Sequence, residues 1–427
     1  MRKRLSGLLA LSLWVMTTNA QPKVYTSDID RFWIAYDSAR STTDTAIQQR
    51  YFQQLYIDPG TPGLKAFMKL RRYDAPLYTR LIDKYPKFWV SIRPNTLRIK
   101  TKTAAIEKAI DHFKELYPDL QPATMYFTIG GLRSGGTTNA DMVLVGAEIA
   151  TADSNTDASE LSDYFKRNFK HQNPENIVAL DVHEYVHTQQ RQTDGNTLLS
   201  QIIKEGGADF IAELASGMPN NSAYMVYGRE HADSVRTAFL KDMYGPNSLG
   251  WLYNASVPIA DLGYYTGYTI CKGYYQKEKD KKQAIKDIIR VDYENDSAVD
   301  AFLDESGYFP QKPDKKALLA QYEAYRPAVT ALTPDINHHT DVDTSVTTLV
   351  VTFSGPMGNG FSINDGPGGK DEYPIVKGGG FSADHLTYTV RLALKPAHHY
   401  AFVLTALGFA SQQGYPLKEY AVDFTTK

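Results

Sequence analysis

The sequence predicts an α+β protein in which a mostly helical part is followed by an all-β part, and three observations lead to this prediction. Apolar residues recur at helical spacing through most of the chain before Pro327. Two strand patterns, at residues 124–129 and 142–149, interrupt this periodicity. Beyond Pro327, short β-like runs separated by turn residues replace it. The chain has 427 residues, a length that favours two or three domains.

Residues 1–20 have the three parts of a signal peptide. Residues 2–4 are basic, residues 5–16 are apolar, and residues 18–20 offer a cleavage site before Gln21. The apolar run is too short to span a bilayer comfortably, and no later segment is a transmembrane candidate. We therefore expect an exported protein, periplasmic or secreted; the alternative is an uncleaved membrane anchor.

The composition is that of a globular protein. Hydrophobic residues make up 42% of the chain and charged residues 22%, so most of it is able to bury a core. The net charge of −2 gives no indication of a nucleic-acid partner. The single cysteine, Cys271, cannot form an internal disulfide. It also lies far from the expected cleavage site, so no lipid attachment through an N-terminal cysteine is expected.

A glycine-rich segment, residues 130–137, separates the two predicted strands of the helical part. Glycine-rich loops bind phosphates in some proteins, but the P-loop lysine is missing here and no dinucleotide-binding spacing fits. We therefore expect a flexible loop between two strands of one sheet.

The C-terminal hundred residues predict a β-sandwich. Strand patterns recur at 347–353, 387–394, 400–407 and 420–425, with turn residues between them. We therefore expect a signal peptide at 1–20, a first domain at 21–326 and a β-sandwich domain at 327–427.

The central chemical signal is the sequence His183-Glu184-Tyr185-Val186-His187. Residues four apart lie on one face of a helix, so both imidazoles reach one ion. Zinc prefers such nitrogen ligands, and a catalytic zinc site uses three protein ligands and a water. Glu184, beside the first histidine, is placed to act as the general base. The alternative is that both histidines are ordinary polar residues of an amphipathic helix.

A third ligand is expected on a neighbouring helix, and Glu205 is the candidate. Glu205 and Asp209 are four residues apart on a predicted helix at 198–216, an arrangement that supplies a glutamate ligand in one branch of zinc peptidases. In that branch the aspartate orients a ligand histidine. Gly206 and Gly207 lower helix propensity, and we expect them to permit a close approach to the helix that carries the histidines.

These motifs, with several shorter ones, resemble a known family. The chain is similar to the predicted zinc proteases related to the gliding-motility B lipoprotein of Bacteroidetes, from about Asp28 to Leu303. The resemblance implies a zincin architecture like that of thermolysin, of the gluzincin type. This sequence lacks the N-terminal lipid cysteine of the lipoprotein branch, which favours a soluble exported enzyme over a role in the gliding machinery. The shorter matching motifs are residues 29–33, 60–64, 129–131, 135–137 and 146–148.

The C-terminal part resembles a bacterial Ig-like domain of the surface-layer type. The matching residues are 351–357, 394–396, Tyr400 and 422–426. Such modules position or anchor a catalytic domain, so the resemblance implies association with the cell surface.

The resemblance also implies a hydroxyl or imidazole donor for the oxyanion of the reaction. Tyr268 is our choice, because related enzymes place a donor roughly sixty residues beyond the glutamate ligand; the alternative is that this tyrosine packs between helices. The strand at 142–148 is the expected edge for an extended peptide substrate. The other donor candidates are His231, Tyr264 and Tyr265.

The predicted function is that of an exported zinc metallopeptidase acting on a peptide or protein substrate. His183, His187 and Glu205 would hold the zinc, and Glu184 would activate the attacking water. Two other functions remain open. One is a zinc hydrolase of a non-peptide amide or sugar-linked substrate, and the other is a non-catalytic surface protein in which the β part is the working module.

Overall fold

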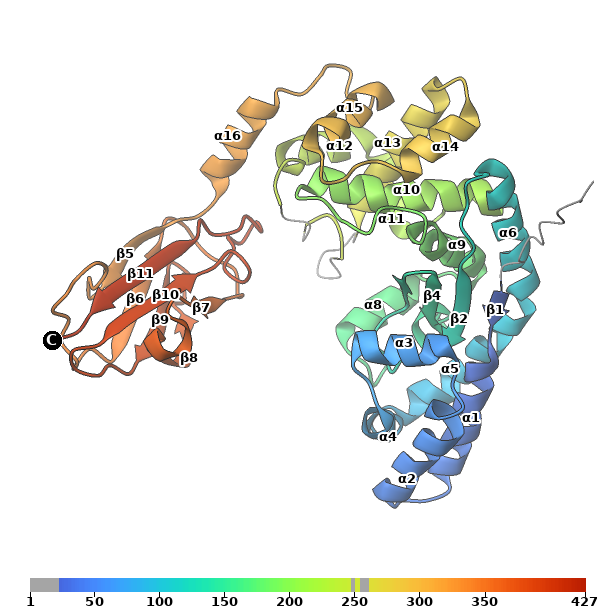
Figure 1. Cartoon of the computed structure of the whole chain (residues 1–427), viewed down its shortest axis with the longest axis horizontal. Coiled ribbons are helices and arrows are strands. Elements are labelled where there is room, and N and C mark those ends of the chain that lie inside the picture. Colours follow the sequence, from blue (N-terminus) through green and yellow to red (C-terminus); the bar gives the residue numbers. More distant parts are fainter. Residues whose placement is uncertain (1–22, 247–249, 254–260) are drawn as a thin grey trace, which may run out of the picture. The chain divides into compact units, whose positions relative to one another are not determined.

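A computed structural model describes residues 23–246, 250–253 and 261–427 (Figure 1). The predicted signal peptide, residues 1–20, lies outside these described residues. The chain divides into two compact units. The described residues of the first are 23–161, 174–189 and 214–217; those of the second are 162–173, 190–213 and the described part of 218–427.

The sheet of the first unit has the strand order β1-β2-β4-β3. The strands are β1 (Lys23–Tyr25), β2 (Thr124–Thr128), β3 (Gly136–Asn139) and β4 (Met142–Gly146). β1, β2 and β4 are parallel, and β3 pairs antiparallel with β4. The prediction that residues 142–148 form a sheet edge is therefore wrong: β4 is interior, and β3 is an edge strand. We missed β3 because two glycines precede its threonines and mask the strand pattern.

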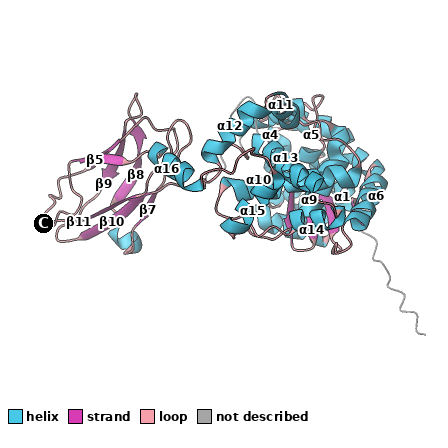
Figure 2. Ribbon diagram, turned by 90° about the horizontal axis from the view of Figure 1, so that it is seen from above, coloured by secondary structure: helices cyan, strands magenta, loops and turns pink. Residues whose placement is uncertain are grey.

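Helices cover this sheet (Figures 1 and 2). Side chains of Asp44, Thr61 and Asp74 accept hydrogen bonds from the first backbone N–H groups of three of these helices, which fixes where each begins. Phe32 and Trp89 are fully buried and pack against each other at the centre of the aromatic core. The helices are α1 (Ser27–Arg40), α2 (Thr45–Tyr51), α3 (Pro62–Arg71), α4 (Ala75–Lys84), α5 (Pro86–Arg98), α6 (Thr103–Leu116), α7 (Ala147–Ala150) and α9 (Ile177–His187).

The glycine-rich segment connects β2 and β3 of one sheet, as predicted, and a buried carboxylate binds its backbone. Glu148 in α7 is fully buried. Its two oxygens accept hydrogen bonds from Gly130 N and Leu132 N, each at 2.8 Å. Gly131 between them has a φ of +62°, which glycine adopts without strain. Burial raises the pKa of Glu148 from 4.5 to about 7, and the two N–H donors oppose that shift.

The raised pKa of Glu148 makes the stability of the folded protein depend on pH. Its pKa is raised on folding, so between about pH 4.5 and 7 the folded protein binds more protons than the unfolded chain. The Glu148 contribution to stability therefore grows as pH falls through this window and is lost as pH rises. Glu148→Gln loses one accepted hydrogen bond, and we expect it to cost about 1–3 kcal/mol at pH 5.5. Urea unfolding at pH 5.5 and 7.5 checks this. Equal pH dependence in both proteins would contradict the assignment.

The second unit begins its helical part with α8 (Asp163–His171) and α10 (Leu198–Ser216). Gly206 in α10 faces Gly267 and Tyr268 of a later helix so closely that an added Cβ would overlap their backbone. The expectation that Gly206 permits approach to the histidine helix is therefore wrong; its neighbour is α13. The other helices are α11 (Ala223–Glu230), α12 (Ala232–Asp242), α13 (Leu262–Lys277), α14 (Lys281–Ile289), α15 (Asp296–Ser306) and α16 (Lys315–Tyr325).

The C-terminal part of the second unit is all β. Helices end at Tyr325, and the first strand begins at Val329. The strands form two antiparallel sheets, β5-β6-β9-β8 and β11-β10-β7. Leu349 and Val390 of one sheet and Phe402 of the other belong to a single buried core, as expected of a sandwich. The strands are β5 (Val329–Thr333), β6 (Thr348–Phe353), β7 (Ile363–Asp365), β8 (Ile375–Phe381), β9 (Thr387–Leu392), β10 (His399–Leu404) and β11 (Tyr420–Thr425).

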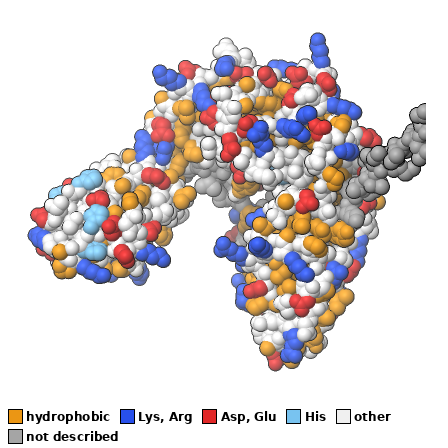
Figure 3. Space-filling model, in the orientation of Figure 1, with side chains coloured by type: hydrophobic (Ala, Val, Ile, Leu, Met, Phe, Trp, Pro, Cys, Tyr) orange, Lys and Arg blue, Asp and Glu red, His pale blue; other side chains and the backbone are white. Residues whose placement is uncertain are grey.

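The surface carries charges of both signs. On the face drawn in Figure 3, acidic and basic side chains are interspersed, in line with the net charge of −2. Within the described ranges, no helix is long and apolar enough to cross a membrane.

Candidate metal centre

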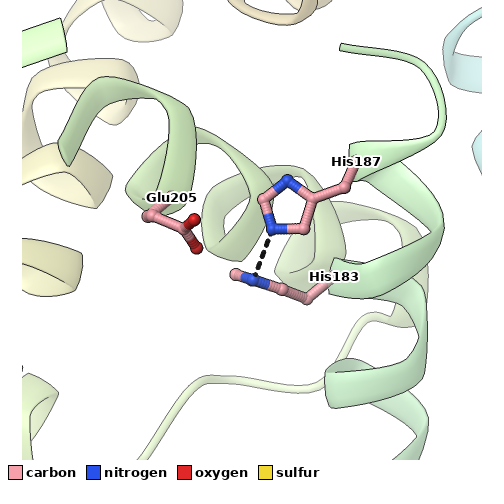
Figure 4. Close-up of side chains that lie close together, drawn as sticks. All are labelled: His183, His187 and Glu205. Carbon is pink, nitrogen blue, oxygen red and sulfur yellow. Dashed lines mark hydrogen bonds between the residues drawn. The ribbon is translucent and has the colours of Figure 1, made fainter. Parts of the chain in front are cut away.

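The helix α9 brings the two predicted histidine ligands to one face. Val182, Tyr185 and Val186 are fully buried, so the helix is fixed by its apolar side. Tyr185 adds a hydrogen bond, because its hydroxyl accepts from Ala123 N at 2.8 Å. On the other side His183 Nε2 and His187 Nε2 lie 3.0 Å apart (Figure 4). This spacing follows from the helical repeat, which stacks residues four apart.

Glu205 of α10 completes the group. One ligand atom from each of His183, His187 and Glu205 lies within 4.8 Å of the others, and all three side chains point toward one another (Figure 4). Two donors on one tetrahedral zinc are about 3.3 Å apart, given bond lengths of about 2.0–2.1 Å. Two imidazoles and one carboxylate are a donor set of catalytic zinc sites, and they leave a fourth position open. The residues therefore fit a zinc ion without large movement.

Glu184 lies against the backbone of the edge strand β3. An ideal Cβ added to Gly136 would lie 2.7 Å from Glu184 Cδ. Glu184 is half-buried and follows His183 directly in α9. The predicted base is thus flanked by a strand edge on one side and a ligand residue on the other.

Asp209, predicted to orient a ligand histidine, is almost fully buried. Its Oδ2 accepts hydrogen bonds from Tyr224 Oη at 2.9 Å and Asn220 Nδ2 at 3.1 Å. These donors fix the carboxylate in α10 one turn beyond Glu205. Its orienting role toward a histidine stays a prediction.

The hydroxyl of Tyr268, the predicted oxyanion donor, is bonded to side chains other than the predicted metal ligands. Its hydroxyl donates to Glu213 Oε1 at 2.6 Å and accepts from Lys272 Nζ at 3.1 Å. Glu213 lies two helical turns beyond Glu205, or about 12 Å along α10. The choice rested on a sequence distance, and the α10–α13 crossing directs this hydroxyl to a different carboxylate. Of the other candidates, His231 is exposed and bonds Tyr227 O through Nδ1 at 3.0 Å.

Tyr253 is a tyrosine whose hydroxyl reaches a predicted ligand. Tyr253 Oη donates to Glu205 Oε1 at 2.8 Å. The nearby Trp251 anchors this segment, because its Nε1 donates to Asp242 Oδ2 at 2.9 Å. Burial and the Glu205 carboxylate both raise the pKa of Tyr264, which lies beside Tyr253. Sequence reasoning missed Tyr253 because its segment has neither periodicity nor a motif.

Asp181 is a second residue that the sequence did not single out. It is fully buried in α9, and neither carboxylate oxygen has a hydrogen-bond partner among the described residues. Burial raises its pKa well above the ordinary value, and Glu184, one turn away, adds to this effect. Burial thus disfavours the charged form of Asp181.

The β part contains two pairs of adjacent histidines, His338-His339 and His398-His399. His399 lies between Glu372 Oε1 at 3.1 Å and Asp423 Oδ2 at 3.0 Å, and His398 Nε2 contacts the Asp371 carbonyl at 2.9 Å. His338 and His339 are exposed.

A comparison of the sequence with models of protein families shows to which family the chain belongs. A family model described as gliding motility protein GldB matches residues 23–238, about half of the chain. The chain belongs to the GldB family. The matched range contains His183, Glu184, His187 and Glu205 of this GldB-family protein and ends before Tyr253.

Two solved structures show weak likenesses to the chain. CopC from Methylosinus trichosporium OB3b is 19% identical, covers 24% of this chain and 94% of its own, and has a TM-score of 0.19. A crystal structure of the S-layer protein rSbsC is 14% identical, covers 94% of this chain, and has a TM-score of 0.18. The chain spans 45% of that structure's length. No curated protein matches the chain. These scores are too low to support an argument about fold or function.

Proposed function

We propose that this GldB-family protein is a zinc metallopeptidase of the cell envelope. The observation that carries the proposal is the convergence of His183, His187 and Glu205 within 4.8 Å, with Glu184 next to the first ligand. A structural zinc site would fill its fourth position with protein and would need no neighbouring base. An open position beside a carboxylate instead favours hydrolysis.

The roles of the chain's own residues follow from their positions. A zinc ion, when bound, would polarise the scissile carbonyl and acidify a water. Glu184 takes a proton from the attacking water and returns it to the leaving amine. Tyr253 holds the Glu205 carboxylate through its 2.8 Å hydrogen bond. The free edge of β3, next to Glu184, offers backbone groups to an extended peptide.

The zinc content of the exported form, residues 21–427, tests the metal site directly. We expect about one zinc per chain in the wild type and none in His187→Ala, because two remaining ligands hold the ion poorly. His231→Ala is the matched control, since that histidine is exposed and bonded to Tyr227. Elemental analysis is the measurement. Absence of zinc from wild type incubated with the ion would overturn the proposal.

We expect Tyr253→Phe and Tyr268→Phe to differ in their effect on zinc affinity. Tyr253→Phe removes the hydrogen bond to Glu205 Oε1, and we expect it to weaken zinc binding about tenfold. Tyr268→Phe removes a bond to Glu213 instead and should leave zinc affinity unchanged. Competition with a chromophoric chelator measures both. The reverse ranking would restore Tyr268 as the tyrosine of the site.

The family description favours a second function. A gliding motility protein could use this fold without catalysis, as a surface component whose β part binds a partner. In that case zinc, if bound, would stabilise the protein, and substitution of Glu184 would not change its action. The phenotype of a Glu184→Gln strain in a gliding assay separates the two functions.

A further inference from the structure

We propose that Gly136 is a positioning residue for Glu184: the bare backbone of β3 determines where the general base stands. The inference rests on the proposed function, because it concerns the same site. Gly136 has no side chain with which to contact the metal or the substrate, so it would act only through Glu184.

The geometry leaves no room for a side chain at this position. An ideal Cβ on Gly136 would lie 2.7 Å from Glu184 Cδ and 2.9 Å from Cγ, and it would also overlap Oε1. Carbon atoms pack at about 3.5–4.0 Å, so even a methyl group would have to displace Glu184. The three atoms nearest to the added Cβ all belong to that one residue.

The backbone conformation does not itself require glycine at 136. Gly136 pairs with Val145 in the β3–β4 ladder and is not among the positive-φ glycines. Alanine adopts this conformation, and glycine weakens a strand and often marks a close approach. Gly131 differs, because its φ of +62° does favour glycine. The approach of Glu184 therefore explains Gly136.

The strand is fixed, so the carboxylate is the part that must move. Ser134 Oγ donates to the Gly136 carbonyl at 2.7 Å, and Gly146 N donates to the Gly135 carbonyl at 3.0 Å. Glu184, in contrast, meets the added methyl with Cγ, Cδ and Oε1 of a flexible side chain, which can rotate away. Gly136→Ala should therefore fold normally and keep its metal ligands, while its general base stands in the wrong place.

A double-mutant cycle tests this role. The proteins are wild type, Gly136→Ala, Glu184→Gln and the double variant. Gly135→Ala is the control, because its added Cβ meets only Ile149 and Ala150. We expect Gly136→Ala to lower kcat by about 10²-fold with an unchanged zinc content, and to have no further effect in the Glu184→Gln background. Binding of acetohydroxamate, a zinc chelator whose acidic proton needs a neighbouring base, should follow the same pattern without any substrate.

Two outcomes would overturn the inference. One is a Gly136→Ala protein that binds acetohydroxamate and turns over substrate as wild type does. The other is an effect of equal size in the Glu184→Gln background, which would mean that Gly136 acts through something else. A crystal structure of Gly136→Ala decides the question without metal or substrate. A changed Glu184 rotamer supports the role, and an unchanged rotamer ends it, whether or not the protein proves to be a peptidase.

Discussion

Glu184→Gln is expected to reduce peptide hydrolysis by at least about 10³-fold while the protein keeps its zinc. The amide has the size of the carboxylate but accepts no proton, so the attacking water loses its base. His183, His187 and Glu205 are untouched, and these three converge without Glu184. The measurement combines kcat/KM on a peptide mixture with zinc content by elemental analysis.

The control for this change is Glu213→Gln. Glu213 is also a partly buried carboxylate, but it lies about 12 Å along α10 from Glu205 and accepts from Tyr268. We expect its variant to remain active. Hydrolysis that survives in Glu184→Gln would show that another group serves as base. Loss of zinc together with activity would leave the role of Glu184 as base unsupported.

Gly267→Ala is expected to destabilise the protein by about 3 kcal/mol or more. An added Cβ on Gly267 would overlap the carbonyl of Ile202 in α10, and one on Gly206 would overlap the backbone of Tyr268. Overpacking against side chains usually costs about 1–3 kcal/mol. Backbone on both sides cannot rotate away, so the helices α10 and α13 must separate. Urea unfolding measures the loss, and a shift of Glu205 should weaken zinc binding as well.

Gly207→Ala is the matched control, because Gly207 is the neighbour in α10 of Gly206, the glycine that faces Gly267 of α13. Its added Cβ would meet only side chains, at 3.3 Å from Ile288 Cγ2 and 3.4 Å from Cys271 Sγ. Alanine also gains about 1 kcal/mol of helix propensity over glycine. We expect a net change below about 1 kcal/mol. If Gly267→Ala costs no more than this control, the close crossing of α10 and α13 is not a feature of the folded protein.

Patterns carried by a few neighbouring residues were readable from the sequence. The predicted helix that carries His183 and His187 corresponds to α9, and the predicted strands at 347–353 and 420–425 correspond to β6 and β11. Helical and strand periodicities repeat over two to four residues, so the local sequence determines them. Strand β8 was missed, because consecutive glycines at 378–380 remove the alternation of side chains on which such a prediction depends.

The sequence by itself determined the spacing of the candidate ligands: two histidines one helical turn apart, and a glutamate four residues before an aspartate on the next long helix. Only the tertiary structure decided what surrounds them. It brings Tyr253 rather than Tyr268 to Glu205, Gly136 to Glu184, and α13 rather than α9 to Gly206. The reason is physical: these contacts join residues 48 to 62 positions apart, and no local repeat connects such distant residues before the chain has packed.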